Sequence, residues 1–237
     1  MKQFFSHLTC LVLFVQACSP SKHEATHTSD VQPIVDSIRS LYAPDKRTAL
    51  FDVTVTGMTL AGETNLPAAK TALLQALPKQ YIDSIRTLPE ASPGAYTLAI
   101  VSISVANLRA KPGHPSEMVT QATLGVPLKV LKKDRGWYLV QTPDKYIAWT
   151  EGGGIKLMNM TEAAQWQSLE KAIYIKPYGF AYATANTDSS TVSDLVYGDV
   201  VAFRQQQGNF YEVSFPDGRT AYIPAGEITL YKDWAVI

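Results

Sequence analysis

Short runs in which apolar and polar residues alternate mark the second half of the chain. The clearest are Leu128–Leu131 after Gly125, Trp137–Thr142 after a charged turn, and Tyr146–Thr150 after the next turn. A period of two is typical of a strand with one buried face, and turns every 8–12 residues are typical of small all-β barrels or sandwiches. The pattern therefore predicts a β domain built from strands of about five residues.

The same pattern occurs twice. When the sequence is shifted by 73 positions, Asn107–Leu157 lies over Phe180–Leu230 without a gap, and twelve of the 51 aligned residues are identical. Turn residues are among the identities, for example Gly125 over Gly198. A fixed offset that preserves the turns indicates one supersecondary unit used twice.

The strand after the charged turn shows which face each copy buries. Successive side chains of a strand point to opposite faces, so Tyr138 and Val140 share one face. Trp137 and Leu139 share the other face. The second copy keeps the first pair and changes the second pair. We therefore predict that Tyr138 and Val140 face the core, and that Trp137 lies on the outer, more exposed face.

Several short elements of the first copy carry a family resemblance. They are Asn107-Leu108-Arg109 followed by Pro112, Gly125 before an apolar strand, Gly136-Trp137-Tyr138-Leu139-Val140, and Ala148-Trp149. These elements resemble the bacterial SH3 (SH3b) family of small β-barrels found in secreted wall proteins. The second copy departs from the pattern, with Phe180-Ala181-Tyr182 at its opening and Tyr222 in place of the Trp. The resemblance implies two SH3-like barrels, at residues 98–158 and 174–232.

The first thirty residues predict export and anchoring. Lys2 precedes an apolar core, Leu8–Val15, that is too short to span a bilayer as a mature helix, so residues 1–17 are predicted to be a signal peptide. Val15-Gln16-Ala17-Cys18 resembles a bacterial lipoprotein box, which implies lipidation of Cys18 after cleavage. The alternative is a plain secretory signal followed by an incidental Cys. Residues 18–30 are small and polar, as expected for a tether.

Residues 31–96 follow a different pattern. An apolar stripe at helical spacing, Val31–Leu41, precedes a hairpin that begins with Ala49–Thr56, and a second helix is expected after Pro67. Tyr81–Leu88 alternates again as a strand. Helix, hairpin, helix and strand in this order resemble the BON domains of bacterial envelopes, which are thought to contact lipid or wall. The alternative is a packing module with no ligand. The predicted fold class is α+β and all-β, a small BON-like α+β module followed by two SH3-like β-barrels.

Two connecting segments complete the predicted organisation. Glu90–Tyr96 is expected to be a linker, and residues 161–173 are expected to form a short linker helix between the barrels. Thr161 is the expected N-cap of that helix, with Glu162 favourable in its first turn. Trp166 is expected to pack against a barrel rather than to bind a ligand.

Composition narrows the possible chemistry. The formal net charge is zero and no basic stripe is present, which argues against a nucleic-acid partner. No Cys follows Cys18 and no His follows His114, so the sequence offers no Cys/His catalytic pair. The triple glycine at residues 152–154 lacks the Gly-Lys-Ser/Thr of a phosphate loop. His23 and His27 are four apart but fit a solvated tail better than a metal site, so neither a metal nor a cofactor is expected.

The order of the parts resembles a family of enzymes. A lipoprotein signal, a tether, a small α+β piece containing Tyr42-Ala43-Pro44-Asp45-Lys46-Arg47 and two SH3b copies are similar to the N-terminal part of NlpC-type cell-wall cysteine peptidases. In that family a papain-like domain follows and cuts the γ-D-glutamyl bond to the diamino acid of peptidoglycan stem peptides, while the SH3b modules help to shape the substrate cleft. The Cys nucleophile and His base of that domain have no match in this sequence. The chain is therefore expected to be non-catalytic.

These observations predict a cell-envelope lipoprotein, anchored by its lipid on the periplasmic or cell-surface side of the membrane, whose SH3b modules bind peptidoglycan or its stem peptides. The alternatives are the targeting and substrate-shaping part of an NlpC-type endopeptidase, which would give it a hydrolase partner, and a protein–protein scaffold in the envelope. Aromatic side chains suit the first role because they offer wide apolar contact with few rotatable bonds. The predicted ligand-binding residues are Arg109, Trp137, Tyr146, Trp149, Phe210 and Tyr222.

Overall fold

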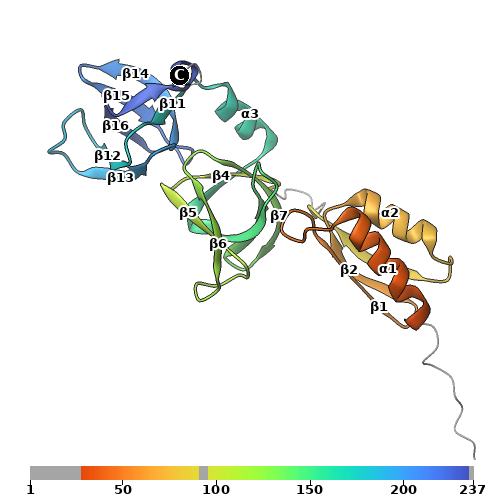
Figure 1. Ribbon diagram of the computed structural model, residues 1–237. Coiled ribbons are helices and arrows are strands. Elements are labelled where there is room, and N and C mark those ends of the chain that lie inside the picture. Colours follow the sequence, from red (N-terminus) through yellow and green to blue (C-terminus); the bar gives the residue numbers. More distant parts are fainter. Residues whose placement is uncertain (1–27, 91–95, 235–237) are drawn as a thin grey trace, which may run out of the picture.

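The computed structural model describes residues 28–90 and 96–234. The predicted signal peptide, Cys18 and the middle of the predicted linker lie outside these residues. The described chain is mostly β, with one three-stranded sheet, two seven-stranded sheets and a few helices. Figure 1 shows the three sheets in sequence order, from the helix-covered sheet near the N-terminus to the sheet beside the C-terminus. Among the helices of the described residues, none has the length and apolar character needed to cross a membrane.

Residues 28–90, here called the N-terminal segment, have the predicted order of helix, hairpin, helix and strand. The first helix begins at Thr28, inside the stretch predicted as tether. The hairpin strands are antiparallel, and the last strand joins the sheet parallel to the second strand. The elements are α1 (Thr28–Tyr42), β1 (Phe51–Thr56), β2 (Thr59–Thr64), α2 (Pro67–Ala76) and β3 (Ile82–Thr87).

Both helices of the N-terminal segment cover the same face of its sheet (Figure 1). The apolar stripe of α1 points to this face because residues four apart lie on one side of a helix. Proline is well placed at the start of α2, where a missing N–H leaves no helical bond unmade. The fully buried side chains of this core include Val35, Val53, Leu60, Ala69 and Leu73.

The first seven-stranded sheet, here called the first sheet, runs from residue 98 to residue 158. Its strand order is β10-β4-β7-β8-β9-β5-β6. In Figure 1 it curls round its own core. Its elements are β4 (Leu98–Val101), β5 (Val105–Arg109), β6 (Met118–Thr123), β7 (Pro127–Asp134), β8 (Trp137–Gln141), β9 (Ile147–Glu151), η1 (Gly152–Gly154) and β10 (Ile155–Met158).

The second seven-stranded sheet, here called the second sheet, repeats this order strand for strand. Adding 73 to the first residue of each strand of the first sheet gives the start of its counterpart, and the β-bulges in β5 and β7 recur in β12 and β14. The order β17-β11-β14-β15-β16-β12-β13 is thus the same arrangement. The elements are β11 (Lys171–Tyr174), β12 (Tyr178–Tyr182), β13 (Thr191–Val196), β14 (Val200–Gln207), β15 (Phe210–Ser214), β16 (Thr220–Pro224) and β17 (Ile228–Leu230), followed by α4 (Tyr231–Trp234).

The predicted core face of β8 is confirmed. Val140 is fully buried in the core of the first sheet, and Tyr138 packs against that core. Leu139, on the opposite face, is also buried, at 6% exposure. It is buried because it meets Leu88 of the N-terminal segment, so part of the outer face of the first sheet is an internal contact.

The helix between the two sheets differs from the prediction. It spans α3 (Met160–Ser168), and a strand begins at Lys171, so the predicted extension to residue 173 is wrong. Its N-cap is Asn159, not Thr161, because Asn159 and Glu162 bond to each other's backbone N–H groups in a capping box. Trp166 packs against both sheets, as predicted, in a cluster with Ile100, Met158 and Ala202.

The first sheet inserts one side chain into the core of the second. Leu124, in the turn between β6 and β7, is fully buried among core residues of the second sheet. Its N–H donates to Oδ1 of Asp199 over 3.1 Å, and its carbonyl accepts a bond of 3.0 Å from the N–H of Val200. The residue at the same position of the second copy, Tyr197, is 56% exposed. The two sheets therefore dock through different surfaces of the same repeated unit.

Asp199 is a buried acid at this contact. Burial raises its pKa to about 7, although the N–H groups of Val196 and Leu124, which bond to it, favour the ionised form. Nearby, the hydroxyl of Ser104 donates to Asp194 over 2.6 Å. Asp194 is a second negative charge facing Asp199, which also raises the pKa of Asp199. The contact between the sheets therefore contains polar groups that are bonded to one another across it.

Candidate functional site

A small pocket of about 110 Å³ opens on the outer side of the first sheet. The strands supply its walls and the loop between β5 and β6 supplies its rim. It is lined by Ile103, Val105, Ala106, Asn107, Arg109, His114, Trp137, Thr150, Glu151 and Gly154. Two residues that the sequence predicted to bind a ligand, Arg109 and Trp137, thus lie together in one pocket.

Strand register explains why these side chains meet. Trp137 on β8 lies directly opposite Glu151 on β9, and directly opposite residues of an antiparallel pair share one face. Arg109 on β5 lies opposite Trp149 on β9, two residues from Glu151 and therefore on the same face. His114 reaches this face from the loop. Residues separated by up to 42 positions, from Arg109 to Glu151, are brought together by the pairing of three strands.

The imidazole of His114 links the two sides of the pocket. Its ring meets the Trp137 ring edge to face, with centroids 5.3 Å apart. Its Nε2 lies 3.7 Å from Oε1 of Glu151. Both side chains of the His114–Glu151 pair are largely exposed, at 71% and 56%, so the pair contributes little to stability and both groups can reach a ligand.

The loop that carries His114 is fastened at its base by Arg109. The guanidinium donates from Nη1 to the carbonyl of Ser116 over 2.7 Å. The N–H of Lys111 donates to the hydroxyl of Ser116 over 2.9 Å, and the N–H of Ala110 donates to the carbonyl of Glu117 over 2.9 Å. These three bonds close the loop, so Arg109 holds the position of the imidazole as well as placing positive charge at the pocket.

The pocket places four kinds of polar or aromatic group around a cavity of about 110 Å³. An indole and an imidazole offer ring faces, a carboxylate can accept from an amine, and a guanidinium with free donors can bind a carboxylate. The described residues contain no group of three or more His, Cys, Asp or Glu side chains placed to hold a metal ion. The pocket is therefore lined by aromatic rings and by side chains of both signs of charge.

Trp149 and Tyr146, the other predicted residues of the first copy, lie elsewhere. Trp149 packs with Leu131 and Leu139 where Leu88 of the N-terminal segment covers the sheet. The ammonium of Lys132 lies 5.5 Å from its ring centroid. Tyr146 packs against the core of the first sheet. The structure therefore brings neither residue into the pocket.

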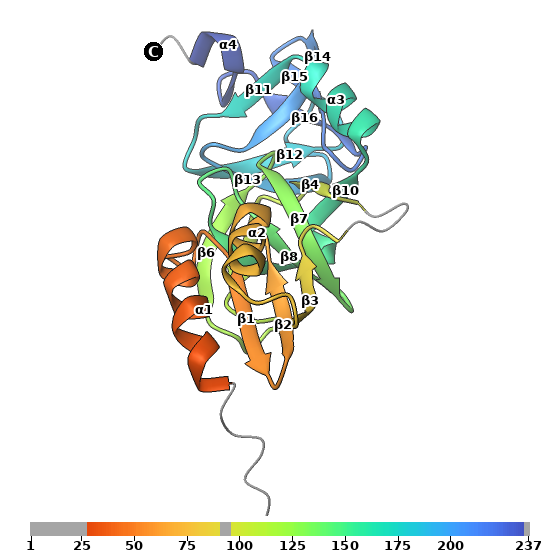
Figure 2. The same cartoon turned by 90° about the vertical axis from the view of Figure 1, so that its right-hand side faces the viewer.

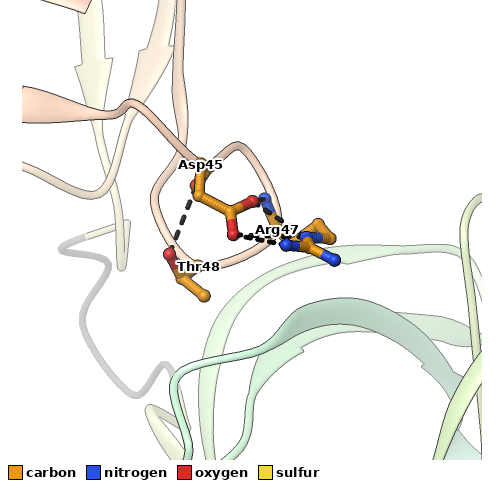
Figure 3. A network of polar contacts seen from close by, with 3 residues as sticks. All are labelled: Asp45, Arg47 and Thr48. Atoms are coloured by element: carbon orange, nitrogen blue, oxygen red, sulfur yellow. Dashed lines mark hydrogen bonds and ion pairs between the residues drawn. The ribbon is translucent and has the colours of Figure 1, made fainter. Parts of the chain in front are cut away.

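A turn of the N-terminal segment docks on the strands that carry the pocket. Asp45 and Arg47 form a bidentate pair across this turn, and the hydroxyl of Thr48 donates to the Asp45 carbonyl (Figure 3). The pairing with Arg47 holds the pKa of Asp45 below its usual range. The Arg47 carbonyl accepts a 2.7 Å bond from the N–H of Ile147, and the Thr48 carbonyl accepts a 3.1 Å bond from Nε2 of Gln141. Residues 42–47, part of the resemblance to NlpC-type peptidases, therefore lead from the end of α1 into a turn that contacts the first sheet.

The second sheet lacks this pocket chemistry. At the positions of Arg109, His114 and Glu151 it carries Tyr182, Thr187 and Pro224. The two predicted residues of this copy, Phe210 and Tyr222, lie half-buried on β15 and β16. Phe210 stands opposite Pro224, and Tyr222 stands opposite both Glu212 and Tyr182. The corresponding face of the second sheet thus carries more aromatic rings, together with Glu212, which pairs with Arg204.

His114 and Glu151 were not predicted from the sequence. Glu151 could have been found from the strand assignment, because it is the residue that faces Trp137 once β8 and β9 form a hairpin around Pro143-Asp144. His114 had no comparable signal, since the path of a loop is not fixed by alternation.

Comparison with known proteins identifies the segment that contains this pocket. Residues 104–156 match the family described as Bacterial SH3 domain, and this range includes every pocket residue except Ile103. Among curated proteins, the "Putative N-acetylmuramoyl-L-alanine amidase YrvJ" of Bacillus subtilis (strain 168) is 25% identical over 135 residues, 55% of this chain. The alignment covers 26% of that protein, so the chain spans about a quarter of the length of this curated relative.

Two solved structures show a partial likeness. An NlpC/P60 family protein from Bacillus cereus ATCC 10987 is 20% identical with a TM-score of 0.47, over 56% of this chain and 56% of that chain. An NlpC/P60 endopeptidase from Photobacterium damselae subsp. piscicida is 13% identical with a TM-score of 0.42, over 61% of this chain and 35% of that chain.

Proposed function

We propose, from the premise that residues 104–156 are a bacterial SH3 domain, that this chain binds peptidoglycan through its stem peptides. The observation that carries the proposal is the pocket on the first sheet, where Trp137, His114, Glu151 and Arg109 converge. Stem peptides carry carboxylates and, at the diamino acid, an amine. A pocket with one guanidinium, one carboxylate and two ring systems suits such a zwitterionic chain.

The named activity of the curated relative supports a role at the wall. An N-acetylmuramoyl-L-alanine amidase acts, by its name, where the stem peptide joins the glycan. The matched stretch covers 55% of this chain, so the two proteins share more than the single SH3 domain. We propose that the shared stretch serves wall binding in both proteins.

The remaining organisation is part of the same proposal. Each seven-stranded sheet is one SH3-like barrel, at residues 98–158 and at 171–230 rather than the predicted 174–232, and the N-terminal segment is a BON-like module that orients the first barrel. The chain is a non-catalytic lipoprotein of the cell envelope, anchored by lipid on Cys18 after removal of residues 1–17. Anchoring suits a wall-binding role because it confines the modules to the space next to the peptidoglycan, where effective concentration is high.

One alternative has a specific observation in its favour. The chain covers only 26% of the amidase that it resembles, so its modules can be the targeting and substrate-shaping part of a hydrolase. In that case an NlpC-type catalytic domain, or a hydrolase partner, would act on the peptide held by the first sheet. The turn Asp45–Thr48 fixes the N-terminal segment beside the strands that form the pocket. This contact also suits a part of a hydrolase that shapes the substrate cleft.

Sedimentation with purified, insoluble peptidoglycan tests the proposal. The purified chain is expected to sediment with the wall and to release no soluble stem-peptide fragments. Trp137→Ala is expected to weaken binding at least tenfold, because a central aromatic residue of an interface typically contributes about 2 kcal/mol or more. Tyr197→Ala, which removes an exposed aromatic ring far from the pocket in sequence, is the matched control and is expected to bind as the wild type does.

Three results would count against the proposal. One is equal sedimentation of wild type and Trp137→Ala, which would show that the pocket is not the binding site. Another is retention of soluble envelope proteins without any affinity for the wall, which would favour the scaffold alternative. Release of peptide fragments by the homogeneous chain would show that it is an enzyme.

A further inference from the structure

A second, larger cavity, here called the α3 cavity, lies where α3 packs against both seven-stranded sheets. Its volume is about 500 Å³, and it shares no lining residue with the pocket around Trp137. Its walls come from β4, the end of β10, the turn before β7, α3, β11, β14 and the start of α4. Small-molecule sites are usually cavities of about 300–1,000 Å³, often at contacts between domains. The α3 cavity therefore has the size and the place of a ligand site.

The walls of the α3 cavity are almost entirely apolar. Every lining residue that the first sheet contributes is apolar. Apart from the Trp166 indole, the only lining side chains with a polar atom are those of Gln167, Lys171 and Tyr231. Water finds few hydrogen-bond partners at such walls, and the transfer of apolar surface out of water is favourable. The walls therefore favour a ligand whose larger part is apolar.

The backbone of these walls is already hydrogen-bonded. The strand β4 is paired on both sides, with β10 and with β7. In the turn before β7, the N–H of Gly125 donates to the Val101 carbonyl over 3.0 Å, and the N–H of Val126 donates to the Thr123 carbonyl over 3.2 Å. A peptide or a sugar would lose hydrogen bonds to water on entry and find few replacements, which is costly. An alkyl chain has no such groups, so it suits these walls better.

One ammonium group stands at the wall of the α3 cavity. Nζ of Lys171 donates to the carbonyls of Trp166 and Leu169 and lies 4.7 Å from the centroid of the Trp166 ring. An ammonium has three donors, so one remains for a ligand. Burial lowers the pKa of Lys171, and among the described residues no carboxylate offsets this effect, since the neighbouring Glu170 pairs with Lys232. A ligand with one negative charge would supply the missing counter-charge.

We propose that the α3 cavity binds a fatty acid, with its alkyl chain against the apolar walls and its carboxylate on the ammonium of Lys171. Gln167 also lines the cavity, and its amide is a second donor for the carboxylate. Walls whose backbone is already paired select the alkyl chain, and the uncompensated ammonium selects the acid. The inference goes beyond the proposed function and does not depend on it, because the two sites share no residue.

Isothermal calorimetry with decanoate, below its micelle-forming concentration, and with 1-decanol tests this inference. The purified chain is expected to bind the acid about tenfold more tightly than the alcohol, because a hydrogen bond to a charged group contributes more than a neutral one. Ala163→Leu places a larger side chain in the cavity and is expected to weaken the binding of both ligands at least tenfold. The matched control is Ala164→Leu, at an exposed position of the same helix outside the cavity lining, which is expected to bind as the wild type does.

Lys171→Met tests the charge separately from the shape of the cavity. The bonds of Lys171 to the carbonyls at the end of α3 also have a structural role, so the alcohol serves as the control within the variant. The affinity for decanoate is expected to fall about tenfold, while the affinity for 1-decanol changes less than twofold. Equal loss for both ligands would show that Lys171 shapes the cavity without binding the carboxylate, and would overturn the assignment of the acid.

The remaining outcomes identify other occupants. If the wild type does not bind decanoate, or if Ala163→Leu binds it equally well, the inference is overturned. Binding only after removal of residues 235–237 would show that this segment of the chain fills the cavity instead. Dimerisation that Ala163→Leu abolishes, without decanoate binding, would assign the cavity to a second copy. Each of these results leaves the proposed function standing if the wild type still sediments with peptidoglycan and Trp137→Ala still weakens that sedimentation.

Discussion

The contact between the two sheets provides a quantitative test of the structure. Leu124 belongs to a turn of the first sheet, yet its side chain is fully buried in the core of the second sheet. Leu124→Ala removes that side chain and leaves the backbone bonds to Asp199 and Val200 in place. The substitution therefore measures the packing contribution of one inserted side chain, separately from the polar bonds around it.

The expected loss is large for a residue in a turn. Leu→Ala at a fully buried site costs about 2–5 kcal/mol, the lost transfer free energy plus the cost of the cavity. For a protein of this size about 1 kcal/mol corresponds to about 2–4 °C, so we expect the melting temperature to fall by about 4–20 °C. The loss arises in the second sheet, although the substituted residue belongs to the first.

Differential scanning calorimetry and urea titration measure this loss. The internal repeat supplies the control, because Tyr197 occupies the same position in the second copy and is 56% exposed. Tyr197→Ala is expected to change the free energy of unfolding by less than about 0.5 kcal/mol. Equal effects of the two substitutions, or a loss below about 0.5 kcal/mol for Leu124→Ala, would show that the two sheets are not joined in this way.

Further predictions concern single residues. The pKa of Asp199 is about 7 in the folded state, raised from 3.8. The folded state therefore binds the proton of this carboxyl more tightly than the unfolded state does. The free energy of unfolding is expected to fall as pH rises from about 4 to about 7. The difference of about 3 units corresponds to up to about 4 kcal/mol, and urea titrations should show this trend in wild type relative to Asp199→Asn. Asn159→Ala should cost about 1 kcal/mol by removing the cap of α3, whereas Thr161→Ala should cost less than half of that in the same assay. Gly62→Ala should destabilise the chain by several kcal/mol, because its Cβ would lie 2.0 Å from the Asp52 carbonyl, and a melting temperature equal to wild type would contradict the hairpin geometry.

The repeat was predictable from the sequence, but its full extent was not. The alignment begins at Asn107, whereas the structure repeats from β4 and β11 onward. Ala99 and Ile100 do match Ala172 and Ile173, but the five residues that follow share no identity between the copies. The strands in this stretch form in both copies because the same backbone hydrogen bonds form in both. Backbone pairing tolerates side-chain substitutions, so the two copies can share strands without sharing identical residues.

The capping of α3 was predictable but was assigned to the wrong residue. Asn159 with Glu162 three residues later has the spacing of a capping box, and that signal was present in the sequence. The end of the helix was harder to predict, because the apolar spacing continues into Ala172 and Ile173, which are buried in a strand instead.

The candidate site was predicted in part. Trp137 and Arg109 stand on strands whose outer face follows from alternation, and both line the pocket. Trp149 stands on the same face by the same rule, yet Leu88 covers it. Alternation assigns a residue to a face of its sheet but contains no information about which distant segment packs on that face. Figure 2 shows the outcome, with the N-terminal segment in front of the strands of the first sheet.

The most direct test of the central claim is the response of one indole to a stem peptide. Titration of the ¹⁵N-labelled chain with a synthetic stem tetrapeptide, with the Trp137 indole N–H signal assigned from a Trp137→Phe spectrum, reports on the pocket itself. The account predicts that this signal shifts with saturation while the indole signal of the buried Trp166 stays in place. A saturating shift elsewhere in the spectrum with no change at Trp137 would contradict it.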